Sequence, residues 1–227
     1  MPAKRILLSW SGGKDAAWTL RELRACGNGV VVGLVTTVVP EHGRSAMHGV
    51  RVGLVRAQAA ATGLPLLEVP LPWPCSNELY EAAFLDGLDH ARKSLGVTHV
   101  AFGDLFLADI RSYRERLLVD TGLEPLFPLW HRPTDELLET MLAAGVRARI
   151  VCLDPTQLDR RFAGRVLDHQ LVGELPTHVD PCGERGEFHT FVTAGPMLAS
   201  PVVVSPGYVV ERDGFVYADF FEVEHDA

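Results

Sequence analysis

The 227-residue sequence predicts an α/β fold with a doubly wound, mostly parallel sheet and a smaller C-terminal α+β unit. Two observations predict it. Short apolar, β-branched runs alternate with segments of helical periodicity from Ile6 to Leu153, as in parallel sheets covered on both faces. After Asp154 the alternation ends, and turn-forming residues separate short strand-like pieces. We therefore expect one domain at 1–130 and a second at 131–227.

The first half of the chain supplies three strands and three helices by these patterns. Glycine follows each predicted helix, which is a common stop signal, and Ser76 or Asn77 can cap the third helix. The stripe of that helix is Phe84, Leu88, Ala91 and Leu95. In order, the predicted elements are a strand at Ile6–Leu8, a helix opened by Lys14, a strand at Val30–Val39, a helix at Val52–Thr62, a strand at Leu64–Val69 and a helix ending at Leu95.

The second half continues with less regular signals. Pro133 marks a helix start and Gly145 its stop, and Asp213-Gly214 predicts a turn between short strands. The predicted elements are strands at Thr98–Asp104, Leu126–Trp130 and Arg147–Leu153, a helix after Asp104, a helix after Pro133, a helical segment at Arg160–Leu171 and β pieces within Pro201–Val223.

The segment Ser9–Asp15, Ser-Trp-Ser-Gly-Gly-Lys-Asp, joins the first strand to the first helix. Its two glycines allow backbone N–H groups to approach an anion, and Lys14 adds charge to the positive end of the helix. Ser9 and Ser11 can donate hydroxyl hydrogen bonds to phosphate. The spacing of a Walker A loop is absent. The segment thus predicts a phosphate site of another type, although an unliganded glycine turn has the same local pattern.

Charged residues after the fourth predicted strand lie near this loop in the predicted sheet. Asp104 ends that strand, so it would share the carboxyl edge of the sheet with Ser9. The alternative is that Asp104 only caps the next helix. Arg114 on that helix can reach phosphate or substrate, while most neighbouring arginines fit a solvated face.

The segment Asp180–Val192 contains a second candidate site. Glu187 and His189 alternate with Phe188 and Thr190, so an extended chain places the carboxylate and the imidazole on one face. Such a pair suits proton transfer near neutral pH. An exposed polar strand gives the same pattern, so both interpretations stay open at this point.

Composition limits the class of protein. A net charge of −8 disfavours a broad nucleic-acid surface, and no apolar run is long enough to span a membrane. Four scattered cysteines without a C-x-x-C pattern indicate reduced thiols and no metal site. With no signal-peptide pattern, we expect a cytoplasmic protein.

Four segments together resemble the diphthine–ammonia ligase (diphthamide synthase) family and nearly span the chain. They are the Ser-Gly-Gly-Lys-Asp loop, Phe102-Gly103-Asp104, Pro128-Leu129-Trp130 and Gly183–Val192. The loop is similar to the Ser-Gly-Gly-Lys-Asp-Ser loop of ATP pyrophosphatases. The resemblance implies an adenine nucleotide alpha hydrolase fold, which is Rossmann-like, and a ligase that adenylates a carboxylate with Mg²⁺-ATP before ammonia displaces AMP.

Roles follow from the resemblance residue by residue. The implied catalytic residues are Glu187, His189 and Asp104; the implied ATP contacts are Ser9, Trp10, Ser11, Gly12, Gly13, Lys14, Asp15 and His48; the implied substrate side is Gly186, Thr190 and Arg114. The implied partners are ATP, ammonia and a small-molecule or protein carboxylate, and a homodimer is expected.

Two alternatives remain at this stage. The acceptor is either the diphthine of elongation factor 2 or a small carboxylate, such as a cobalamin-related compound, which the Lys-poor composition of a high-GC bacterial sequence favours. The protein is otherwise a nucleotide-binding module without turnover, like universal stress proteins. Ala16, in place of the final serine of the loop motif, favours the module; Glu187 and His189 favour the enzyme.

Overall fold

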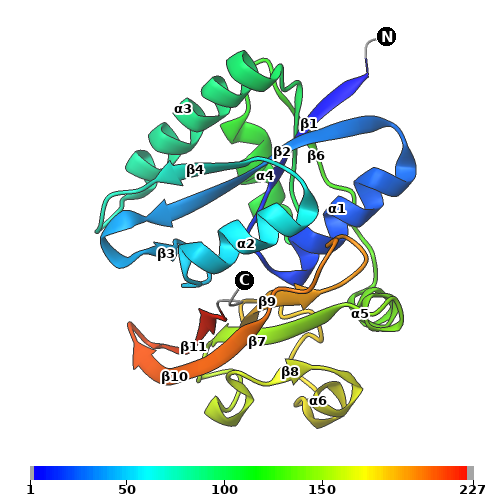
Figure 1. Cartoon of the computed structure of the whole chain (residues 1–227), viewed down its shortest axis with the longest axis vertical. Coiled ribbons are helices and arrows are strands. Elements are labelled where there is room, and N and C mark those ends of the chain that lie inside the picture. The colour runs from blue at the N-terminus through cyan, green and yellow to red at the C-terminus, as the bar shows by residue number, and fades with distance from the viewer. Residues whose placement is uncertain (1–2, 224–227) are drawn as a thin grey trace.

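A computed structural model describes residues 3–223, which form two sheets joined by one hydrophobic core (Figure 1). The first sheet has parallel strands in the order β4–β2–β1–β5–β6, and the short β3 pairs antiparallel with the end of β2. The strands are β1 (Lys4–Ser9), β2 (Gly29–Val39), β3 (Arg44–Ser45), β4 (Leu66–Pro70), β5 (His99–Ala101) and β6 (Glu124–Leu126).

Helices cover both faces of this sheet because its central strands are apolar on both sides. In β1, Ile6 and Leu8 pack with the first two helices, whereas Leu7, which points the other way, packs with the third. Each of the first three helices ends at a glycine with positive φ. The helices are α1 (Lys14–Cys26), α2 (Val52–Thr62), α3 (Asn77–Leu95) and α4 (Ala108–Leu117).

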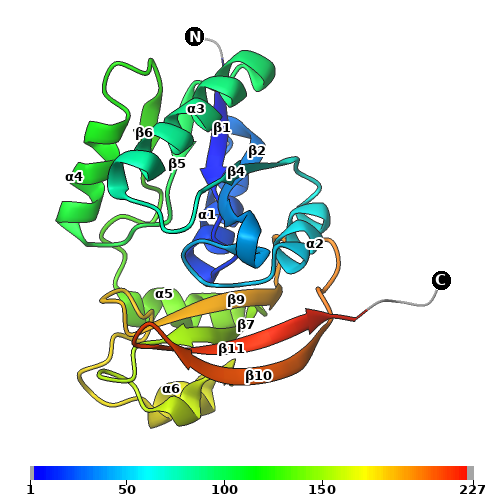
Figure 2. The same ribbon diagram turned by 90° about the vertical axis from the view of Figure 1, so that its left-hand side faces the viewer.

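The second sheet is antiparallel and lies across the end of the first (Figure 2). Its order is β10–β11–β7–β8, and β9 pairs with β7. The strands are β7 (Arg147–Leu153), β8 (Val166–Leu167), β9 (Phe188–Ala194), β10 (Val204–Arg212) and β11 (Phe215–Glu222). The remaining helices are α5 (Thr134–Ala143), α6 (His169–Glu174) and the 3-10 turns η1 (Pro40–His42) and η2 (Arg160–Phe162).

The predicted fold class is confirmed, and two predicted elements are wrong. The strand predicted at Leu126–Trp130 is only the end of β6, since Pro128 has no N–H for a ladder and the Trp130 N–H donates to the Phe127 carbonyl in a turn (3.2 Å). The helix predicted at Arg160–Leu171 is divided into η2, β8 and α6. Gly164 has a φ of +79°, and Val166 and Leu167 pair with β7.

One core connects the two sheets. Trp10, Leu20 and Leu54 from the N-terminal part belong to the same buried cluster as Ile150 and Phe191. The boundary at 130/131 stays a prediction. Among the residues from 3 to 223, no helix is both long and apolar enough to cross a bilayer.

Candidate active site

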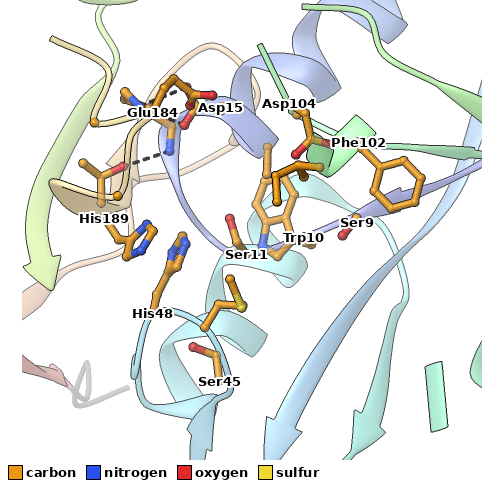
Figure 3. Close-up of a pocket in the computed structure, with 18 of the residues that line it drawn as sticks. Ser9, Trp10, Ser11, Asp15, Ser45, His48, Phe102, Asp104, Glu184 and His189 are labelled. Atoms are coloured by element: carbon orange, nitrogen blue, oxygen red, sulfur yellow. Dashed lines mark hydrogen bonds and ion pairs between the residues drawn. The ribbon is translucent and has the colours of Figure 1, made fainter. Parts of the chain in front are cut away.

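A cavity of about 590 Å³ opens at the carboxyl ends of β1 and β5 (Figure 3). The chain leaves β1 toward β2 on one side, and β5 lies on the other, so this is the switch point where open parallel sheets bind ligands. The cavity wall comes from the loop after β1, the end of β2, the turn after β3, helices α3 and α4, and the segment Cys182–Thr190. Both parts of the chain thus contribute to it.

Strand β9 holds the loop Ser9–Asp15 in place. Thr190 Oγ1 accepts a hydrogen bond from the Lys14 backbone N–H (3.1 Å), and the Val192 N–H donates to the Gly12 carbonyl (2.9 Å). Thr190 therefore caps α1 from a distant strand, although the sequence placed it on the substrate side. Gly12 and Gly13 are buried beneath the cavity, whereas Ser9, Ser11 and Lys14 border it.

The Lys14 ammonium is the central charge of the site. It is 2% exposed, lies 2.8 Å from Asp15 Oδ2, and donates to the Cys182 carbonyl. Burial lowers the pKa of Lys14, but the charges of Asp15 and Glu184 outweigh burial and hold it above its usual value. A permanent positive charge therefore lies at the N-terminus of α1, which suits an anionic ligand.

Asp104 and Glu184 add carboxyl groups near Asp15, as Figure 3 shows. Gly103 permits this, since a Cβ there would lie 3.0 Å from the backbone of Asp15. Asp104 does not cap α4, whose N-cap is Leu107. Burial raises the pKa of Asp104; burial and, next, the charge of Asp15 raise that of Glu184 to about 8. Both groups thus hold protons more readily than exposed carboxylates.

The buried atoms Asp104 Oδ2 and Arg114 Nε have no hydrogen-bond partner, although they lie 3.8 Å apart. Such atoms are rare in folded proteins and mark places where a ligand or ion supplies the bond. Asp15 and Asp104 fit Mg²⁺, which proteins often bind through one or two carboxylates plus substrate phosphates. Within residues 3–223 no group of three metal-ligating side chains occurs, so phosphate would have to complete the set.

His48 and His189 stack on one another beside the loop, with ring centroids 4.5 Å apart and planes inclined by 17°. Burial lowers the pKa of both, and their mutual charge and that of Lys14 add to the effect; for His189 the value is about 4. Both rings are therefore neutral near pH 7. The structure brings together the two histidines that the sequence found separately.

Glu187 is separate from the cavity. It is 1% exposed, and its two carboxylate oxygens accept from the backbone N–H groups of Asp180 (2.7 Å) and Arg185 (2.9 Å). It holds the turn that carries Glu184 and Gly186, both of which border the cavity. The carboxyl group that the sequence pattern missed is thus Glu184, which stands in the same motif three residues earlier.

His189 makes stability depend on pH. Its pKa of about 4 lies below the ordinary 6.5, so the unfolded chain binds more protons between these values, and stability is lost as the pH falls. Glu184 has the opposite slope, so a variant must be compared with the wild type. We expect the His189→Asn variant to gain up to about 3 kcal/mol relative to the wild type between pH 7 and pH 4. Urea unfolding at several pH values measures this difference, and parallel curves would contradict it.

Family comparisons match both parts of the chain. Residues 4–125 match the model described as "Diphthamide synthase N-terminal domain", and residues 133–224 match "Diphthamide synthase C-terminal domain". Proteins named diphthine–ammonia ligase from Bos taurus and Danio rerio are each 25% identical, over 94% and 88% of this chain and 88% and 86% of their own. One of that name from Schizosaccharomyces pombe is 25% identical over 92% of this chain, which spans only 37% of it.

Proposed function

The chain belongs to the diphthamide synthase family, and from this premise we propose that it is an ATP-dependent ligase joining ammonia to a carboxylate. ATP is cleaved to AMP and pyrophosphate as the carboxylate is activated, and ammonia then displaces AMP. The relatives named diphthine–ammonia ligase support the ligase class. The observation that carries the proposal is that the Ser-Gly-Gly-Lys-Asp loop and three carboxyl groups, Asp15, Asp104 and Glu184, meet at one cavity.

In the first step the acceptor carboxylate oxygen attacks the α-phosphorus, and the bond to the bridging oxygen of the β-phosphate breaks. The hydroxyls of Ser9 and Ser11 and the charge of Lys14 bind the departing pyrophosphate, since charge-assisted hydrogen bonds are the strong ones. Asp15 and Asp104 would hold Mg²⁺, which neutralises phosphate charge when bound. His48 and His189, both neutral, can donate N–H bonds to phosphate at the same wall.

In the second step the ammonia nitrogen attacks the acyl carbon, AMP leaves with the bonding electrons, and the new amide nitrogen loses a proton. We assign that proton to Glu184, because it borders the cavity and its pKa of about 8 is close to neutral pH. The acceptor lies at the Arg114 end, where the unpartnered Nε can bind an oxygen of a carboxylate.

A reaction with three separable components tests this function. The protein is incubated with Mg²⁺-ATP, ammonium and a panel of carboxylates that includes elongation factor 2 carrying diphthine and small carboxylates. We expect AMP in amounts above that of the protein only when all three components are present. A protein that binds ATP but forms no AMP with any acceptor would instead be a nucleotide-binding module, the outcome that Ala16 at the cavity wall favours.

A further inference from the structure

The peptide between Gly12 and Gly13 is held from the side that faces away from the cavity. The Gly12 carbonyl accepts two hydrogen bonds, from Gln58 Nε2 (3.0 Å) and from the Val192 N–H (2.9 Å). Gly12 has a φ of +81°, and neither residue of the pair has a Cβ. A Gly-Gly peptide therefore has little intrinsic preference for one orientation, and these external bonds must determine it.

The side-chain amide of Gln58 has one orientation. The residue is 0% exposed, and its Oε1 accepts from the Trp10 indole N–H (3.1 Å), while Nε2 also donates to the Val192 carbonyl (2.5 Å). An indole nitrogen can only donate, so Oε1 must face Trp10, and Nε2 must face Gly12. Trp10 thus determines which end of the amide meets the loop.

The orientation of this peptide reaches the cavity through Ser11. A trans peptide points its C=O and N–H in opposite directions, so a fixed Gly12 carbonyl fixes the Gly13 N–H on the other side. There the Gly13 N–H donates to Ser11 Oγ (3.2 Å), and Ser11 borders the cavity. Because Ser11 Oγ accepts this bond, its own proton remains available for an anion in the cavity.

We propose that Gln58, held by Trp10, is a positioning residue of the phosphate site: it fixes the Gly12–Gly13 peptide and thereby the hydroxyl of Ser11. The residue acts through the loop and does not itself touch the nucleotide. The inference rests on the proposed function only in taking the phosphates of ATP as the ligand. Without Gln58 the peptide can turn over, which would point the Gly12 carbonyl toward the phosphates.

The test compares Gln58→Met with Thr62→Val. Methionine keeps the length of the side chain and removes all three hydrogen bonds. Thr62 lies in the same helix, is buried, and makes a hydrogen bond to the Ala59 carbonyl away from the loop, so its variant controls for lost stability. We expect Gln58→Met to weaken Mg²⁺-ATP and Mg²⁺-pyrophosphate binding at least tenfold by calorimetry, and Thr62→Val to change neither more than twofold. Unchanged affinities in a folded Gln58→Met protein would overturn the proposal.

A milder variant, Trp10→Phe, keeps the proposal testable should Gln58→Met not fold. It leaves Gln58 in place but frees its amide to rotate, and we expect a threefold to tenfold loss of affinity. A crystal structure of either variant gives a readout that needs no nucleotide. A Gly13 N–H still bonded to Ser11 would overturn the proposal, whereas a reoriented peptide supports it even if the wild type proves not to turn over ATP, in which case only the proposed function fails.

Discussion

Replacing Lys14 with methionine should lower the affinity for Mg²⁺-ATP at least tenfold and destabilise the protein by about 3 kcal/mol. The first effect follows from loss of the permanent charge at the N-terminus of α1. The second follows because the Asp15 carboxylate loses its counter-ion; its side chain is 23% exposed, which places the cost at the low end for buried pairs. Calorimetry and urea unfolding measure the two effects separately.

The double variant Lys14→Met with Asp15→Asn separates charge pairing from ligand binding. Removing both charges leaves no unpaired carboxylate, so we expect part of the lost stability to return while ATP affinity stays low. A Lys14→Met protein that is folded and binds ATP as tightly as the wild type would remove this residue from the phosphate site.

The two glutamates of the motif Gly183–Val192 should behave in opposite ways. Glu187→Gln is expected to cost about 2–4 kcal/mol, because an amide cannot accept from both backbone N–H groups that the carboxylate now satisfies. Glu184→Gln should lower amide formation by about 10² to 10⁴ and leave the protein as stable, or more stable above pH 8, since burial already disfavours its ionised form.

Each glutamate variant is the control for the other, because the same amide replaces a carboxyl group three residues away. Urea unfolding gives the stability, and initial rates of amide formation with the identified acceptor give the chemistry. If Glu187→Gln lost activity without losing stability, and Glu184→Gln kept full activity, the roles would be those that the sequence first predicted.

Elements with local signals could be predicted from the sequence. Helix α2 occupies the predicted range Val52–Thr62 and ends at Gly63, and strand β7 occupies Arg147–Leu153. The phosphate loop was recognised because its residues are consecutive. The segment Arg160–Leu171 failed, since pairing with β7 outweighed its helical pattern.

Residues whose roles depend on distant partners could not be assigned in this way. Thr190 caps a helix that begins 176 positions earlier. Gln58 is the seventh residue of α2, where a glutamine is equally typical of an exposed face, and only the fold reveals its bonds to Trp10 and Gly12. Glu187 fitted the alternation of a strand, but β9 begins one residue later, and neighbouring backbone N–H groups occupy its carboxylate.

The most direct test of the central claim is the identity of the products formed from ATP. Phosphorus NMR of the complete reaction with Mg²⁺-ATP, ammonium and an accepted carboxylate distinguishes cleavage at the α-phosphorus from cleavage at the γ-phosphorus. The proposed activation of a carboxylate predicts AMP and pyrophosphate in equal amounts, matched by the amide. ADP and orthophosphate as the main products would contradict it.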